Sequence, residues 1–240
     1  MLPRLMAHMT VEDMEQALQQ TQTAIIPLGG TEQHGYHLPL STDLLTSYEV
    51  AQAVSERTGC LVASPIYYSY SGGTLKGTTD ISPALTTLLV VEIAESLRRQ
   101  GVRNIIIASG HGGSEHLEAM RAAVLLLRRR HQHLRVELPL LWELSPRFKE
   151  LFAAGDHHAG ATETSLILYR RPDLVRTKAG EPAGADTSGR DVRYDPEWSV
   201  GVSGDPFQAS VELGRELFEE CVAALADTVR ALEASEGQTE

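Results

Sequence analysis

The chain has 240 residues, of which 42% are apolar, and this length suffices for one domain with a substantial core. Its formal net charge of −11 argues against a nucleic-acid partner, which would require a basic face. The two cysteines, Cys60 and Cys221, have neither redox-motif nor zinc-finger spacing, so we expect a reduced, cytoplasmic protein.

Helical and strand-like hydrophobic patterns alternate along most of the chain. In chain order they predict a helix over residues 11–20, a strand over 24–28, a helix over 44–58, a strand over 60–66, a helix over 83–100, a strand over 104–109, a helix over 115–130, a strand over 135–144, a helix over 161–169 and a helix over 211–234. This alternation predicts a single three-layer αβα domain over residues 1–240, with a mostly parallel central sheet.

Several residues mark where these elements begin and end. Thr10, with Asp13 three residues later, is a candidate helix N-cap, and Gly59 and Gly101 are candidate helix stops. Residues 67–82 are rich in Gly, Ser, Thr and Tyr, and form either the lining of a pocket or a surface excursion. We expect residues 170–203 to be irregular, with room for a short hairpin, and the polar tail after the last helix to fray.

Neither a targeting segment nor a membrane span is predicted. The N-terminus lacks the basic and apolar regions of a signal peptide. No apolar run approaches the roughly 20 residues that a transmembrane helix needs.

The stretch PLGGTEQHGYHLPLSTD, which follows the first buried strand, concentrates ionisable side chains. Glu32 and His34 are two residues apart, so in an extended segment both side chains point the same way. Asp43 returns to them nine residues after His34. Carboxylate and imidazole ligands in such a set suit zinc, manganese or iron. The alternative is a polar loop with a hydrogen-bonded histidine.

A second candidate lies after the strand over residues 104–109, a continuous apolar run typical of a central parallel strand. The strand leads directly into Gly110-His111-Gly112-Gly113-Ser114. Ligands of open α/β sheets bind beyond the carboxyl ends of the strands, which is where His111 stands. A lone GHGG would carry little weight, but an acidic and histidine-bearing loop follows an earlier strand as well.

The third candidate is DHHAGATETS, in which His158 and Glu163 flank a turn of small residues before a helix. The grouping fits a functional site, but helix caps and surface salt bridges produce similar groupings. Trp142 could form a wall of a pocket, although a buried core tryptophan is the commoner case.

Four segments together resemble the creatininase (creatinine amidohydrolase) family, over nearly the whole chain. They are PLGGTEQHGYHLPLSTD, the strand ending in SGHGG, DHHAGATETS and the late GVSGDPFQAS. The resemblance implies a metal-dependent hydrolase of C–N bonds in cyclic amides, formamides and related groups. It also implies a compact homo-oligomer, often a hexamer, with two metal ions per site.

Transferred to this sequence, the resemblance implies that Glu32 and His111 bind one divalent transition-metal ion, either Zn, Mn or Fe. His34 would bind a second ion, with Asp43 bridging the two. His158 matches the family's catalytic histidine.

The mechanism follows from these parts. An ion lowers the pKa of bound water, and a histidine that titrates near neutrality suits protonation of a leaving nitrogen. We assign this role to His158. Glu163 matches a site glutamate that either coordinates metal or holds a ligand in place.

Three departures from the family pattern bear on the substrate. Creatininases carry a metal-binding glutamate where this chain has Gly113, and a glutamate where it has His157; many relatives have Asn at Ser114. The second metal site is therefore either completed by another residue, such as Glu163, or weaker. Creatinine becomes a poor expectation as substrate.

Other branches of the family include deformylases of pyrimidine intermediates and a peptidase that trims a ribosomally made redox cofactor, and nothing in the sequence chooses among them. A catalytically silent metal-binding member is a further alternative. A nucleotide-binding protein is disfavoured because GHGGS lacks the P-loop lysine and the G-x-G-x-x-G spacing.

The expected partners are a small-molecule amide substrate and further copies of the chain, with neither nucleic acid nor membrane. Of the remaining histidines, His37 is predicted to orient a metal ligand or to be structural, and His116 to be structural. His8, His131 and His133 are predicted to lie on the surface.

Overall fold

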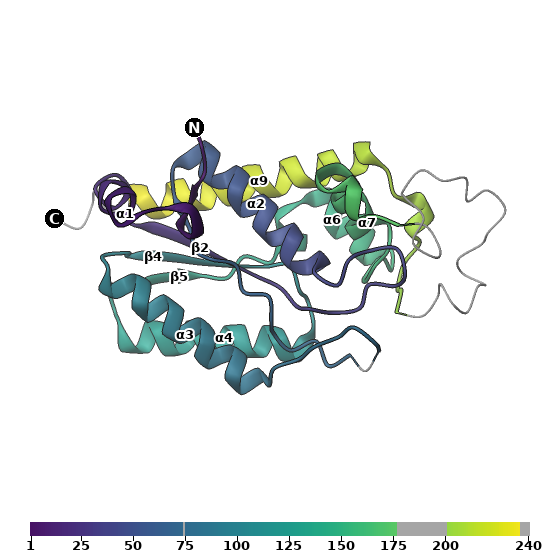
Figure 1. Ribbon diagram of the computed structural model, residues 1–240, viewed down its shortest axis with the longest axis horizontal. Coiled ribbons are helices and arrows are strands. Elements are labelled where there is room, and N and C mark those ends of the chain that lie inside the picture. Colours follow the sequence, from purple (N-terminus) through teal and green to yellow (C-terminus); the bar gives the residue numbers. More distant parts are fainter. Residues whose placement is uncertain (74, 177–200, 236–240) are drawn as a thin grey trace.

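A computed structural model describes residues 1–73, 75–176 and 201–235 (Figure 1). It contains a five-stranded sheet in the order β1-β3-β2-β4-β5, and every pairing is parallel. The strands are β1 (Arg4–Leu5), β2 (Thr23–Leu28), β3 (Leu61–Val62), β4 (Asn104–Ser109) and β5 (Arg135–Glu137). This architecture confirms the predicted α/β fold with a mostly parallel sheet.

Helices cover both faces of the sheet. The α-helices are α1 (Val11–Leu18), α2 (Thr42–Thr58), α3 (Pro83–Arg99), α4 (Ser114–Arg130), α5 (Leu141–Leu144), α6 (Pro146–Ala153), α7 (Ala161–Arg170) and α9 (Val211–Ala234). Short 3₁₀ turns occur at Met6–His8, Pro172–Leu174 and Pro206–Gln208. Helices α3 and α4 lie together below the sheet in Figure 1, and α2, α7 and α9 lie above it.

The central strands bury both faces because their side chains alternate between two cores. Ile26 and Ile107 pack with residues of α3 and α4 in one cluster. Ile25 and Ile106 pack with residues of α2 and α9 in the other. All four are fully buried, which is why the middle of each of these strands is a continuous apolar run.

Several predicted element boundaries are confirmed. Thr10 and Asp13 form a reciprocal capping box at the start of α1. Gly59 ends α2 in the left-handed conformation, with φ 79°. The side chain of Ser210 caps α9, which spans the predicted residues.

Two predicted strands are wrong in extent. The strand expected over 60–66 is limited to β3, because Pro65 lacks a backbone N–H and only an isolated bridge at Ile66 follows. The strand expected over 135–144 ends at Glu137, shortly before Pro139. The chain then turns into α5 and α6, which the sequence analysis missed.

Part of the predicted irregular region, residues 177–200, lies outside the described residues, as does most of the polar tail. The described loop after β3 lies against the loop after β2, through a bridge between Thr31 and Thr79. Within the described ranges, none of the helices is both long and apolar enough to cross a bilayer.

Candidate metal centre and active site

The candidate site lies at the carboxyl ends of β2 and β4, the neighbouring central strands. The loop after β2 carries Glu32 and His34, and the turn after β4 carries His111. Asp43 comes from the first turn of α2. Segments far apart in the sequence therefore meet at the sheet edge where ligands of α/β proteins bind.

Two glycines allow Asp43 to reach this edge. A Cβ atom on Gly29 would lie 2.2 Å from the backbone nitrogen of Leu44, and one on Gly110 would lie 1.9 Å from the carbonyl oxygen of Asp43. Neither position accommodates a side chain while α2 begins where it does. The glycines after both strands therefore set the position of the α2 N-terminus between the strand ends.

Asp43 stands between two imidazoles. Its Oδ1 lies 3.0 Å from His34 Nε2, and its Oδ2 lies 3.0 Å from His111 Nδ1. Glu32 Oε2 lies 3.1 Å from the same His111 nitrogen. These four side chains are buried, so they form one compact cluster away from bulk water.

The carboxylates make this cluster strongly favourable for positive charge. Burial opposes charge on His34, but Asp43 and Glu163 raise its pKa well above its ordinary value. Burial also opposes charge on His111, but Asp43 and Glu32 raise its pKa to about 10. Against the effect of burial, the two imidazoles hold the pKa of Asp43 well below its usual range. Either protons or a metal ion can supply the positive charge.

The unpaired atoms of the cluster favour a metal ion. Glu32 Oε2, Asp43 Oδ2 and His111 Nε2 are buried without a hydrogen-bond partner. The two oxygens lie at ion-pair distance from His111 Nδ1 but outside hydrogen-bond geometry. Buried carboxylate oxygens beside an imidazole nitrogen are a fitting donor set for Zn, Mn or Fe.

Three overlapping groups of side chains bring one potential ligand atom each to within 4.8 Å of one another. The groups are Glu32, Asp43 and His111; His34, Asp43 and Glu163; and Glu32, His34 and His158. Asp43 is shared by the first two groups, so the geometry offers two adjacent positions for a divalent ion.

Glu163 lies in the first turn of α7, beside the second position. Its Oε2 lies 3.6 Å from His34 Nε2 and accepts a hydrogen bond of 2.5 Å from the backbone N–H of Ala159. Burial raises the pKa of Glu163, but His34 outweighs burial and lowers it. The carboxylate is therefore ionised and placed where it can complete an ion site.

Gly113 cannot carry the carboxylate that creatininases have at this position without a rearrangement. A Cβ atom on Gly113 would lie 2.6 Å from His111 Nε2. Among the described residues, Glu163 and Asp43 are the two carboxylates within ion-pair distance of His34.

His158 approaches the cluster from the segment before α7. Its ring lies 4.3 Å from the ring of His34, measured between centroids. Its Nε2 contacts Gln33, at 2.9 Å from the carbonyl oxygen and 3.2 Å from the side-chain nitrogen. The half-buried imidazole is thus held at the edge of the cluster.

A small cavity of about 40 Å³ adjoins the site. His158, Glu163 and Gly112 contribute to its lining, and Trp142, Phe148 and Phe152 supply an aromatic wall. Trp142 is half-buried and lines this cavity, so the expectation of a buried core tryptophan is incorrect. The cavity lining does not include the described part of the loop over 67–82.

The other histidines of the described residues lie outside the groups of potential metal ligands. His37 is buried, and its Nε2 contacts Thr164 Oγ1 at 3.0 Å. His116 is buried against Ser109, and burial lowers its pKa to about 3. His8 and His133 are exposed, as predicted, whereas half-buried His131 forms a 2.7 Å ion pair with Glu95.

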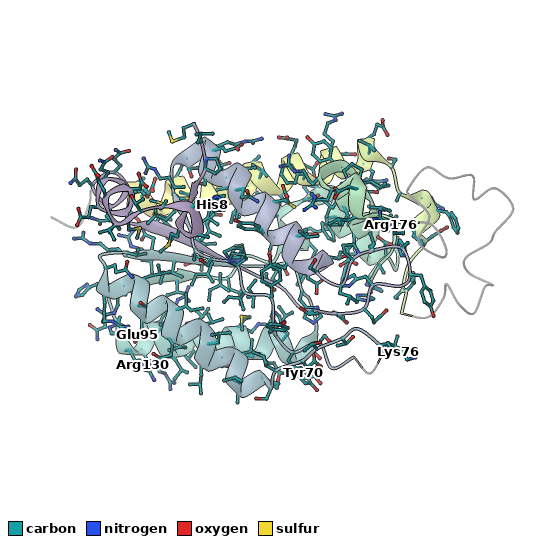
Figure 2. All side chains as sticks on the ribbon, in the orientation of Figure 1. His8, Tyr70, Lys76, Glu95, Arg130 and Arg176 are labelled. Carbon is teal, nitrogen blue, oxygen red and sulfur yellow. The ribbon has the colours of Figure 1, made fainter. Side chains whose placement is uncertain are left out.

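Figure 2 shows Glu95, the partner of His131, together with Arg130 at the end of the molecule away from Arg176.

Sequence reasoning missed two residues that shape the site. Gln33 lies between two candidate ligands in the sequence, but its side chain contacts His158. Its position inside the TEQHG motif was the one sequence signal that could have identified it. Asp156 accepts hydrogen bonds from the backbone N–H groups of Ala161 and Thr162, and so holds the start of α7. No local pattern distinguished it from other loop aspartates.

Comparison with known proteins identifies the family of this chain. The creatininase (creatinine amidohydrolase) family model matches residues 7–229. A mycofactocin precursor peptide peptidase from Mycobacterium ulcerans is 35% identical over 215 residues, which cover 82% of this chain and 80% of that protein. A creatinine amidohydrolase from Pseudomonas putida is 30% identical over 230 residues, which cover 86% and 88% of the two chains.

Solved structures show the same fold. A structure described as "Creatininase Mn" superposes with a TM-score of 0.76 and 28% identity, over 95% of this chain and 98% of that chain. A mutant creatininase described as "Zn-Zn type" has a TM-score of 0.75, also at 28% identity, over 95% and 97% of the two chains. The chain therefore belongs to the creatininase family of metal-dependent amidohydrolases.

Proposed function

We propose that this protein hydrolyses a C–N amide bond at a dinuclear metal centre, with His158 as general acid and base. One observation carries the proposal. The two oxygens of Asp43 face two different imidazoles, each at 3.0 Å, so this carboxylate could serve an ion beside each imidazole.

Five side chains supply the ion ligands in this proposal. Glu32 and His111 would hold the first ion and His34 and Glu163 the second, with Asp43 shared by both. Support comes from the unpaired buried oxygens of Glu32 and Asp43 and from the position of Glu163 beside His34.

When bound, divalent ions lower the pKa of water and polarise the amide carbonyl. The protein's own part is to place a proton at the leaving nitrogen. His158 is half-buried at the rim of the cluster and borders the cavity, so its imidazole can meet both the cluster and a substrate in that cavity. Proton donation to the leaving nitrogen allows it to depart as a neutral amine.

The substrate class is a small cyclic amide, a formamide or a related amide. Creatinine is disfavoured, because Gly113 replaces a carboxylate that creatininases use. We predict that creatinine turnover is slow or absent, well below the ordinary enzyme range of about 1–1,000 per second. Turnover within that range in a standard creatine-release assay would contradict this.

A peptide substrate is the second candidate. The 35% identity to a mycofactocin precursor peptide peptidase favours it, since a peptide bond is also an amide. The aromatic wall of Trp142, Phe148 and Phe152 supports either an apolar side chain of a peptide or a ring substrate. A catalytically silent member would instead bind metal and turn over no amide.

We further propose that the protein is cytoplasmic and forms a homohexamer. Light scattering on the purified protein should then give six times the 26.2 kDa mass of one chain. A monomeric mass would contradict the assembly.

The function is tested by stripping the purified protein with a chelator and restoring it with Zn²⁺, Mn²⁺ or Fe²⁺. Each form is then given lactams, other cyclic amides, formamides and short peptides, and products are followed by mass spectrometry. We expect hydrolysis of at least one class that disappears on stripping and returns with metal. Hydrolysis that is unaffected by stripping would contradict the proposal, and metal binding without hydrolysis of any class would favour the silent alternative.

A further inference from the structure

The backbone of His158 pairs with the backbone of Ser203. His158 N–H donates to the carbonyl of Ser203 at 3.0 Å, and Ser203 N–H donates to the carbonyl of His158 at 2.7 Å. This reciprocal pair fixes where the side chain starts but leaves its ring free to rotate about χ2. Another group must therefore set the orientation of the imidazole.

Gln33 supplies two groups that can set this orientation. Its backbone carbonyl oxygen lies 2.9 Å from His158 Nε2, and its side-chain amide nitrogen lies 3.2 Å from the same atom. The carbonyl can only accept a hydrogen bond, and the amide nitrogen can only donate one. Either tautomer of the imidazole therefore finds a complementary partner on Gln33 without turning its ring.

The Gln33 side chain is itself held in place. Its Oε1 accepts a hydrogen bond of 3.1 Å from the backbone N–H of Gly35, which requires the NH₂ group to be the one that faces His158. The backbone N–H of Gln33 donates to Thr78 Oγ1 at 3.2 Å. The Gly35 contact therefore orients the side-chain amide, and the Thr78 contact holds the backbone that carries it.

Gly201 packs closely against the side chain of Gln33. It adopts φ +73°, and a Cβ atom there would lie 1.7 Å from Gln33 Oε1. The chain can pass this close to Gln33 only with a glycine at this position. The segment that carries Gly201 and Ser203 therefore contacts both Gln33 and His158.

We infer that Gln33 is a positioning residue for His158 and holds its imidazole toward the metal centre. The inference rests on the proposed function for its consequence on rate, but the contact itself is independent of the substrate. Gln33 lies between Glu32 and His34 in sequence, but its side-chain amide contacts Gly35 and His158. Its loss should therefore affect rate and leave metal content unchanged.

Gln33→Met tests this, because it keeps the length of the side chain and removes both polar atoms. Turnover should fall about ten- to a hundredfold, as for other residues that orient a functional histidine, with KM and metal content nearly unchanged. In the His158→Ala background the same substitution should change turnover by less than about twofold, because the residues act as one unit. Gln33→Asn, which is too short to reach, serves if Gln33→Met folds poorly.

Thr31→Val is the matched control, since it removes another hydrogen bond of the same loop, from Thr31 Oγ1 to the carbonyl of Tyr67, without contact to His158. It should retain the wild-type rate. A full Gln33→Met effect in the His158→Ala background, or a loss of metal in Gln33→Met alone, would overturn the inference.

A structural comparison separates this inference from the proposed function. In crystals of the zinc-loaded protein, the His158 ring should have one orientation in the wild type and a rotated or divided one in Gln33→Met. An unchanged ring in the variant would overturn the positioning role even if the enzyme hydrolyses amides. A rotated ring would support it even if no substrate were found.

Discussion

The proposed mechanism assigns ion binding and proton transfer to different residues of this site. Asp43, His34 and His111 are buried and contact one another, whereas His158 is half-buried and borders the cavity. Substitutions can therefore separate the two functions.

His158→Ala is predicted to keep its metal and most of its stability, while turnover falls by about a hundred- to ten-thousandfold. The reason is that a positioned general acid is lost but the carboxylate and imidazole ligands stay. Metal content and rate should be measured side by side on the same preparation.

Glu163→Gln is the companion variant. Because Glu163 lies next to His34, its neutral amide should lower the metal content toward one ion per chain. Loss of metal in His158→Ala would make that histidine a ligand, and an unchanged rate would remove it from the mechanism.

Some contacts between site residues could be predicted from the sequence, and others could not. His111 and Glu32 directly follow predicted strands, and parallel strands align their carboxyl ends, so their meeting was foreseeable. The contact between Gln33 and His158 joins residues 125 positions apart and depends on side-chain direction. No local pattern encodes that direction.

At the scale of elements, the start of α7 positions both Glu163 and His158. Asp156 reaches across the turn, and its two oxygens accept hydrogen bonds from Ala161 N–H at 2.8 Å and from Thr162 N–H at 2.7 Å. These are N–H groups of the first helical turn, which have no partner within the helix.

Asp156→Ala should therefore cost about 1–2 kcal/mol, which for a chain of this size lowers Tm by roughly 2–8 °C. It should also lower turnover, since the turn that carries His158 loses its anchor. Thermal unfolding and rate are measured together. Asp13→Ala is the matched control: it removes the capping box of α1, remote from the site, and should reduce stability alone. Equal rates in both variants would contradict the role given to Asp156.

Helices and strands were predictable where the pattern was long and regular, as in β4 and α9. The failures cluster at prolines. Pro65 and Pro139 interrupt apolar runs that otherwise suit strands, and each lacks the N–H that a strand there would donate, although Pro27 is accommodated inside β2. Helices α5 and α6 depend on packing against α9, which a local reading does not include.

At the scale of the whole molecule, the buried cluster couples stability to pH. In metal-stripped protein the pKa of folded His111 is raised from 6.5 to about 10, and that of His34 is raised as well. The folded state holds these protons more tightly than the unfolded state. The stabilisation is therefore complete below about pH 6.5 and is lost as pH rises toward about 10. Asp43, whose pKa is lowered, contributes in the opposite direction, with a loss only in strong acid.

We accordingly predict that the Tm of the stripped protein falls between about pH 6.5 and 10. Metal-loaded protein should show a smaller fall, because the ions replace the protons. His111→Asn, in stripped form, should flatten the profile. A Tm that rises over this range in stripped wild-type protein would contradict the charge assignment.

The proposed dinuclear centre requires Asp43 to be the carboxylate that two ions share. The decisive measurement is elemental analysis of protein purified under metal-replete conditions, for the wild type, Asp43→Ala, the isosteric Asp43→Asn and the exposed control Glu115→Gln. We predict between about one and two ions per chain in the wild type and the control, and nearly none in either Asp43 variant, because both positions lose a ligand at once. A wild type without bound metal, or an Asp43→Asn variant that retains the wild-type content, would contradict the dinuclear centre.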